Sequence, residues 1–358
     1  MHIPDGYLSP ATCATFGAAM VPSWYAAGRR VGKTVKSRYV PLLAIGAAFS
    51  FLIMMFNVPI PDGTTAHAVG ATLIAILLGP WAAVIAVSIA LLIQALFFGD
   101  GGVLAFGANC FNMALVMPFV GYYVYRLIAQ HTSLTSKRRA LAAGIGGYVG
   151  ICTAALFAGI ELGLQPTLFH SANGTPLYAP FHLSQSIPAM MLAHLTVAGT
   201  VELAVTAGVV AYLQRANVPI LRINHPDVPV TEAEMERRRK LGWGWALVPI
   251  GIIVALTPLG LIAPGGAFGE AAPSGLDLSK YHLSAVPTGL AKFNGFWSHA
   301  LLGGYGFHNG DHPVVGYLVS AVVGILIISA LLFALIALIR AVQGRQSDGP
   351  DDPQQVAA

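Results

Sequence analysis

Residues 64–98 read TTAHAVGATLIAILLGPWAAVIAVSIALLIQALFF. They form two long apolar runs, at 64–79 and 81–98, which are separated only by Gly79-Pro80-Trp81. A membrane-spanning helix needs a mostly apolar run of roughly 20 residues, and these two runs approach that length. The stretch therefore predicts two membrane helices joined by a tight turn, as in a helical hairpin.

The composition of the whole chain supports the same class. Of its 358 residues, 56% are hydrophobic and only 9% are charged, whereas about a quarter of the residues in a soluble domain are charged. We predict an all-α polytopic membrane protein with about nine transmembrane helices. Their expected positions are 9–28, 40–57, 64–79, 81–98, 103–125, 140–163, 184–214, 243–263 and 314–339.

The basic residues predict how these helices are oriented. In a nine-helix topology every Lys and Arg except Lys280 and Lys292 falls on one side, and the basic side of a membrane protein is cytoplasmic. The N-terminus is then outside and the C-terminus cytoplasmic. The outward loops are expected near 58–63, 99–102, 164–183 and 264–313. The net charge of +4 is explained by this topology, so the expected partner is a lipid bilayer and not a nucleic acid.

The chain divides into two membrane modules. Residues 1–214 hold seven of the predicted helices, and 215–242, with its charged run TEAEMERRRK, is expected to be a cytoplasmic linker. Residues 243–342 hold two helices around an outward loop. The polar end 343–358 is expected to be disordered because it is rich in Pro, Gln and Asp.

The N-terminal dipeptide Met1-His2 can chelate a metal ion. A bulky second residue such as His usually blocks removal of the initiator Met, and MHIPDGYLSP lacks the basic region of a secretory signal. We therefore expect this terminus in the mature chain. Its amine, the His2 amide nitrogen and His2 Nδ1 close a five-membered and a six-membered ring. Such a planar set suits Ni(II) or Cu(II) better than Zn(II), which prefers a tetrahedron.

His67 is the candidate for a fourth nitrogen ligand. A helix beginning near Thr64 or Thr65 would have a hydroxyl N-cap and would carry His67 in its first turn, on the outer face. An ionisable side chain just inside a membrane helix is a candidate functional residue. The alternative is an interfacial histidine with only a structural role. The other outward histidines are expected to be solvated: His170, His182, His282, His299, His308 and His312.

Other polar residues could support such a site. Thr65, Asn109 and Asn112 are candidates for hydrogen bonds to the ligands or to the N-terminal segment, with interhelical bonding as the alternative for the two asparagines. Gln94, His194 and Glu202 lie deeper in the predicted helices and are expected to be structural rather than part of a metal path. Three cysteines in apolar stretches are expected to be buried and inert: Cys13, Cys110 and Cys152.

The sequence argues against an enzyme. AGRRVGKT at 27–34 resembles a phosphate-binding loop, but Ala27 stands where the first Gly should be and a membrane helix precedes it. We find no nucleophile–base set or carboxylate pair at membrane depth. A standalone metal transporter needs a polar path across the bilayer, and Glu161 and Glu202 are the only acids within the predicted helices.

Three segments carry a resemblance to a known family. MHIPDGYLSP (1–10), VPIPDGTTAHAVGATLIAILLGPWAA (58–83) and GDGGVLAFGANCFNMALVMPFVGYYVYR (99–126) resemble the CbiM/NikM family, the substrate-capture subunits of energy-coupling-factor cobalt and nickel transporters. The resemblance covers about 1–214. It implies that Met1, His2 and His67 hold the ion. The segment before His67 is one residue longer than the family pattern.

The resemblance also implies partners and a location. Separate ATPase subunits and a transmembrane coupling subunit would drive uptake across the plasma membrane of a prokaryote, and the chain itself would need no cofactor. Residues 243–342, including YHLSAVPTGLAKFNGFWSHALLGGYGF, resemble the small CbiN/NikN component, although its PDGLE-like signature is absent. A fused arrangement is more typical of nickel members, so Ni(II) is the expected substrate and Co(II) the alternative. We expect the second module to be needed for transport but to contribute no ligand.

Overall fold

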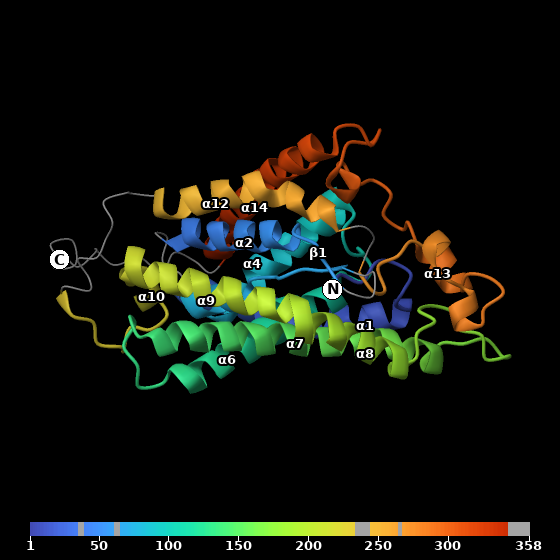
Figure 1. Cartoon of the computed structure of the whole chain (residues 1–358), viewed down its shortest axis with the longest axis horizontal. Coiled ribbons are helices and arrows are strands. Elements are labelled where there is room, and N and C mark those ends of the chain that lie inside the picture. Colours follow the sequence, from blue (N-terminus) through green and yellow to red (C-terminus); the bar gives the residue numbers. More distant parts are fainter. Residues whose placement is uncertain (35–38, 61–64, 233–243, 264–266, 343–358) are drawn as a thin grey trace.

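The computed structural model describes residues 1–34, 39–60, 65–232, 244–263 and 267–342. In this part the chain is mainly helical, and most of the long helices run along the longest axis of the molecule (Figure 1). A two-stranded antiparallel ladder joins β1 (Val58–Pro59) to β2 (Thr65–Ala66). Most of the predicted linker's charged run and the whole of the predicted tail 343–358 lie outside the described residues.

The α-helices follow the apolar runs of the sequence. Up to Arg222 they are α1 (Pro10–Thr34), α2 (Val40–Met54), α3 (Ala71–Leu78), α4 (Pro80–Ile93), α5 (Phe106–Asn109), α6 (Met117–Ala129), α7 (Lys137–Leu168), α8 (Leu183–Ala193), α9 (Gly199–Ala216) and α10 (Val218–Arg222). The second module has α12 (Gly244–Leu256), α13 (Thr288–Phe293) and α14 (Pro313–Val342). Short 3₁₀ turns lie between them: η5 (Thr257–Ile262), η6 (Pro273–Gly275), η7 (Ser279–Tyr281) and η8 (Gly303–Tyr305).

Three π-helical segments interrupt the longer helices. They are η2 (Gln94–Phe98), η3 (Cys110–Val116) and η4 (His194–Ala198). A π turn breaks the regular α-helical spacing and is often found at functional sites. The polar residues Gln94, Asn112 and His194 lie in these segments and are buried, so the irregular turns coincide with the polar positions of otherwise apolar helices.

Five helical stretches of the described chain are long and apolar enough to cross a membrane. They are Pro80–Phe98, Phe106–Ala129, Lys137–Leu168, Leu183–Ala216 and Pro313–Ala341. Two shorter apolar helices cover Val40–Met54 and Ala246–Ile262. The mainly helical class is thus confirmed, whereas the number of nine membrane helices and their orientation stay predictions.

The helix predicted over 64–79 is shorter than expected. It is α3, which begins at Ala71 and has only 8 residues, about 12 Å of helix against a hydrocarbon core of about 30 Å. The predicted N-cap at Thr65 is wrong because Thr65 lies in β2, and Thr64 lies outside the described residues. Gly70 precedes α3 with a φ of 73°, a left-handed conformation that glycine adopts without strain. The chain therefore turns into the helix three residues after His67.

The basic stretch 27–34 is helical. It forms the last turns of α1, which extends to Thr34, whereas the sequence predicted that the membrane helix ends near residue 28 and a loop follows. A phosphate-binding loop follows a strand and opens a helix. The helical conformation of 27–34 confirms that this stretch is not such a loop.

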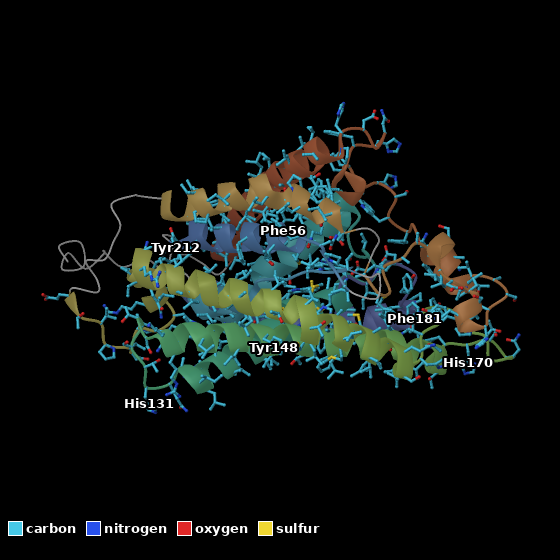
Figure 2. All side chains as sticks on the ribbon, viewed as in Figure 1. Phe56, His131, Tyr148, His170, Phe181 and Tyr212 are labelled. Atoms are coloured by element: carbon cyan, nitrogen blue, oxygen red, sulfur yellow. The ribbon has the colours of Figure 1, made fainter. Side chains whose placement is uncertain are left out.

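Helices from the two predicted modules pack against each other. α7 contacts α6, α8 and α9, and α2 contacts both α4 and α14. α12 also contacts α2 and α14, and these three helices lie side by side in Figure 1. His131 and His170 mark opposite ends of the molecule in Figure 2. α13 lies at the His170 end, where Leu290 N donates to Leu177 O (3.1 Å).

Candidate metal centre

The first nine residues lie inside the helical bundle. Met1 is 2% exposed, His2 3% and Ile3 2%. Ile3 N donates to Asn109 Oδ1 (2.8 Å), and Ile3 O accepts from Asn109 Nδ2 (3.1 Å) and Gly102 N (2.9 Å). An extended segment needs partners for its backbone groups when it is buried, and Asn109 supplies two of them. Asn109 therefore supports the N-terminal segment rather than a histidine ring.

Asp5 and Ser9 anchor the rest of this segment. The Asp5 carboxylate accepts from the backbone nitrogens of Val103 (3.1 Å), Leu104 (2.8 Å) and Ala105 (3.3 Å). Ser9 N donates to Gln165 Oε1 (2.9 Å), and Ser9 Oγ accepts from Thr12 N (3.0 Å), which caps the start of α1. These contacts fix the direction in which Met1 and His2 point.

His67 is held by the turn between β2 and α3. The Glu202 carboxylate accepts from Val69 N (2.8 Å) and Gly70 N (3.0 Å), and Ser50 Oγ donates to Val69 O (2.7 Å). His67 is 3% exposed, and it precedes the helix. Burial, together with the positive Met1 amine and the nearby His2 ring, holds the pKa of His67 well below its ordinary value. Its imidazole is neutral near pH 7 and keeps a lone pair for a metal ion.

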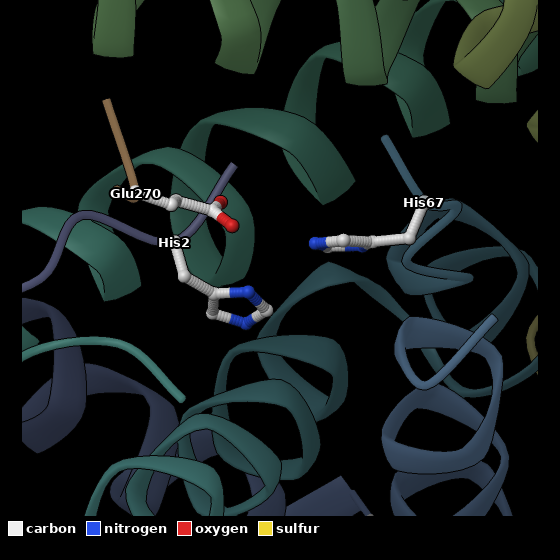
Figure 3. Close-up of side chains that lie close together, drawn as sticks. All are labelled: His2, His67 and Glu270. Carbon is white, nitrogen blue, oxygen red and sulfur yellow. The ribbon is translucent and has the colours of Figure 1, made fainter. Parts of the chain in front are cut away.

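The N-terminus and His67 meet in one place. The Met1 amine nitrogen lies 3.5 Å from His67 Nε2, and the rings of His2 and His67 stack with centroids 4.8 Å apart. Figure 3 shows both rings reaching toward the same space from different parts of the chain. The structure thus brings together the three residues that the sequence singled out as ligands.

Two carboxylates that the sequence did not predict also reach this place. Glu270 Oε1 accepts from the Met1 amine at 2.7 Å, and Figure 3 shows its side chain beside His2. Asp100 Oδ1 lies 3.2 Å from His2 Nδ1. His2, His67 and Glu270 each offer one ligand atom to this place, and these three atoms lie within 4.8 Å of one another. Both acids lie in the predicted outward loops, among mostly apolar and glycine neighbours. This position was the only feature of the sequence that could have indicated them.

Most of the remaining candidate residues make hydrogen bonds with other partners. Asn112 Nδ2 donates to Glu161 Oε2 (2.9 Å), a contact between helices. Thr65 is buried in β2, two residues before His67. His194 Nδ1 pairs with Met190 O (2.7 Å) within its own helix. Glu202 has a structural contact, because its carboxylate accepts hydrogen bonds from the turn that follows His67. The three cysteines are buried and free, as predicted.

The donor atoms at this site define its chemistry. Imidazole nitrogens and an amine suit Ni(II), Cu(II) and Zn(II), and carboxylates add negative charge for a divalent ion. Buried charged groups are costly unless they are paired, and in this structure the amine is paired with Glu270. The arrangement can therefore bind a transition-metal ion.

Apolar helices of membrane length and a buried nitrogen-rich cluster define the class: a multi-pass membrane protein with a candidate metal centre. The chain belongs to the CbiM family, because residues 2–220 match that family's description, a cobalt uptake substrate-specific transmembrane region. This match spans more than half of the chain.

Full-length relatives and a solved structure are similar to this chain. The fused nickel transport protein NikMN of Rhodobacter capsulatus is 48% identical over 343 residues, which cover 92% of this chain and 95% of that protein. The probable fused nickel transport protein LarMN of Lactiplantibacillus plantarum is 47% identical over 341 residues, covering 94% and 97%. A crystal structure of a truncated transition metal transporter is 63% identical, covers 60% of this chain and 98% of that one, and superposes with a TM-score of 0.56.

Proposed function

We propose that this chain is the membrane subunit that captures nickel ions for an energy-coupling-factor importer. The observation that carries the proposal is the convergence of the Met1 amine, His2 and His67 in one buried cluster. It is supported by membership of the CbiM family and by relatives along almost the whole chain that are named nickel transport proteins. In this reading the chain is a transport subunit and catalyses no reaction.

The proposed ligands are four nitrogens. The Met1 amine, the His2 amide nitrogen and His2 Nδ1 form the two chelate rings, and His67 completes the plane. Neighbouring ligands about 2.0 Å from an ion lie about 2.8 Å apart at a right angle, and the Met1 amine is 3.5 Å from His67 Nε2. A small shift of His67 toward the amine would therefore let both nitrogens bind one ion. In this site His2 Nδ1 binds the ion and no longer contacts Asp100.

The energy for uptake comes from other subunits in this proposal. Separate ATPases act through a transmembrane coupling subunit in the plasma membrane of a prokaryote. Residues 1–214 form the capture module, 215–242 the linker and 243–342 the accessory module. A chain truncated near Lys240 should still bind one ion but should support little transport, because the accessory module covers the metal site.

Cobalt is the alternative substrate. The family is described for cobalt uptake, and a relative from Lachnoclostridium phytofermentans, 34% identical over 176 residues, is named a cobalt transport protein. The same four nitrogens can bind Co(II), but Ni(II) lies higher in the general affinity order. A competition titration with the two ions distinguishes the alternatives. The third hypothesis is that the chain transports the metal ion alone. It predicts nickel uptake by the chain without ATPase subunits.

The test is calorimetric titration of the purified full-length chain with Ni(II). We expect one tightly bound ion. His67→Ala should weaken binding by more than about 100-fold, since loss of even a supporting contact costs up to that much. His308→Ala is the control, because His308 is exposed in the outward segment. Equal affinities in both variants would indicate diffuse surface binding and contradict the proposal.

A further inference from the structure

Glu270 is held at the metal site by its own loop. Glu270 N donates to Ala267 O (3.0 Å), and the next residue's carbonyl, Ala271 O, accepts from Tyr7 Oη (2.7 Å). Tyr7 is fully buried and belongs to the same N-terminal segment as Met1. Both the carboxylate of Glu270 and the backbone beside it are therefore attached to the segment that carries the proposed ligands.

We propose that Glu270 is itself a ligand of the transported ion, so that the second module contributes directly to the metal site. This inference rests on the proposed function and extends it. It replaces the expectation that residues 243–342 supply no ligand. The four nitrogens keep the plane around the ion, and the Glu270 carboxylate takes a position above it.

The spacing of the donor atoms supports this role. Two ligands at a right angle about 2.0 Å from an ion are separated by about 2.8 Å. Glu270 Oε1 lies 2.7 Å from the Met1 amine nitrogen, which matches that spacing for a carboxylate above the plane and the amine within it. The ligand atoms of Glu270, His2 and His67 lie within 4.8 Å of one another, which is close enough for small shifts to bring them around one ion.

The charge of the site favours the same arrangement. A divalent ion bound to one deprotonated amide nitrogen and three neutral nitrogens carries a net charge of +1. That charge lies among side chains that are almost completely buried, namely Met1, His2 and His67, where an uncompensated charge is costly. One carboxylate makes the cluster neutral. Asp100 Oδ2 is held by Tyr305 Oη and Gln94 Nε2, and Asp100 Oδ1 lies beside His2 Nδ1, whereas Glu270 Oε1 contacts the amine itself.

Glu270 also lies where an ion would arrive. Its side chain is 19% exposed while that of Met1 is 0% exposed. An ion from outside therefore meets the carboxylate before the nitrogens. Carboxylate oxygens bind hydrated divalent ions readily, so Glu270 can take the ion first and stay bound as the plane forms.

The experiment compares Glu270→Gln with the parent chain, both at full length. Gln has the same length and can still accept a hydrogen bond from the amine, so the loop contact is kept while the anionic ligand is lost. Asp311→Asn is the matched control, because Asp311 is an exposed acid in the same outward segment. Ni(II) affinity is measured by calorimetry. Cu(II) is the spectroscopic probe, because its electron paramagnetic resonance spectrum reports on a carboxylate above a plane of nitrogens.

We expect Glu270→Gln to bind Ni(II) about 10-fold more weakly and to increase the parallel copper hyperfine coupling, with Asp311→Asn like the parent. An unchanged copper spectrum would overturn the inference, with or without a loss of affinity, because the carboxylate would then act without touching the ion. If nickel binding depends on His67 but not on Glu270, only this inference fails. If the parent binds no nickel, or His67→Ala binds as the parent does, the proposed function fails.

Discussion

The carboxylate of Glu202 in α9 accepts a hydrogen bond from the backbone nitrogen of Gly70 at 3.0 Å. The two residues are 132 positions apart, and the same carboxylate oxygen accepts from Val69 N. The contact ties a long helix to the turn that follows His67. The position of a proposed metal ligand therefore depends on a helix that contributes no ligand.

Loss of this contact should weaken metal binding at a distance. Glu202→Ala leaves two buried N–H groups without their acceptor, which costs about 1–3 kcal/mol each. We expect a lower thermal midpoint and about a tenfold loss of Ni(II) affinity, because about 1.4 kcal/mol corresponds to a factor of ten. Thr200→Ala, an exposed position in the same helix, serves as the control. Parent-like nickel affinity in Glu202→Ala would show that the turn does not need this support.

One residue added before Met1 should abolish tight binding. The extension converts the amine into an amide and displaces the chelate rings from His67, whose Nε2 lies 3.5 Å from the present amine. The measurement is Ni(II) titration of a chain extended by one Gly, after mass spectrometry has confirmed both N-termini. Undiminished binding by the extended chain would exclude the amine as a ligand, and so would a parent chain that has lost Met1 and His2.

Gly102→Ala should disturb the N-terminal segment. A methyl group at Gly102 would overlap the carboxylate and the backbone nitrogen of Asp5, in a region where Asp5 accepts three backbone hydrogen bonds. We expect Ni(II) affinity to fall by about tenfold or more, since overpacking costs about 1–3 kcal/mol. The control is Gly17→Ala, because a methyl group at Gly17 meets no atom within 4 Å. Gly174→Ala is less suitable because Gly174 has a positive φ. Gly17→Ala should therefore bind as the parent does, and equal losses in both variants would point to a general effect on folding.

Metal binding should weaken as the pH falls. An ion displaces protons from the amine and the amide nitrogen, and at lower pH protons compete with the ion for the ring nitrogens, so lower pH opposes binding. The pKa of His67 is held well below 6.5 by burial, so the unfolded chain binds this proton more readily than the folded chain. The contribution of His67 to the free energy of unfolding should therefore decrease as the pH drops below about 6.5. Titration and thermal unfolding at pH 8, 6.5 and 5 check both trends.

The same titrations test the planar geometry. Zn(II) prefers a tetrahedron and makes poor use of two fused planar rings, so it should not displace Ni(II) at equal concentration. Cu(II) should bind at least as tightly as Ni(II) by the general affinity order. Displacement of Ni(II) by Zn(II) would contradict four nitrogens in a plane.

The helices could be predicted from the sequence because lipid imposes a simple rule. A backbone in hydrocarbon must satisfy its own hydrogen bonds, so long apolar runs such as 140–163 indicate helices, and α7 indeed covers that run. The rule failed at 64–79, where the run is equally apolar but its first part is buried against protein and need not be helical. Gly70, with its left-handed backbone, was the visible sign of that break.

The site could be predicted only in part. Met1 and His2 were recognisable because the chelating atoms lie next to each other in the chain, and His67 because histidine is unusual beside an apolar run. Glu270 and Asp100 were not recognisable, because their positions beside Met1 and His2 come from contacts across the fold, 269 residues apart in the case of Glu270 and Met1. Sequence spacing contains no information on such contacts.

The burial of the N-terminal segment has a consequence for the order of assembly. Residues synthesised first are held by residues synthesised much later, including Asn109, Gln165 and Ala271. The first nine residues can therefore make their native contacts only after the helices that surround them have been inserted, because distant contacts can form only after the chain between them exists. The proposed metal centre is then completed only at the end of folding, and nickel binding, if the proposal holds, would report that this last step has taken place.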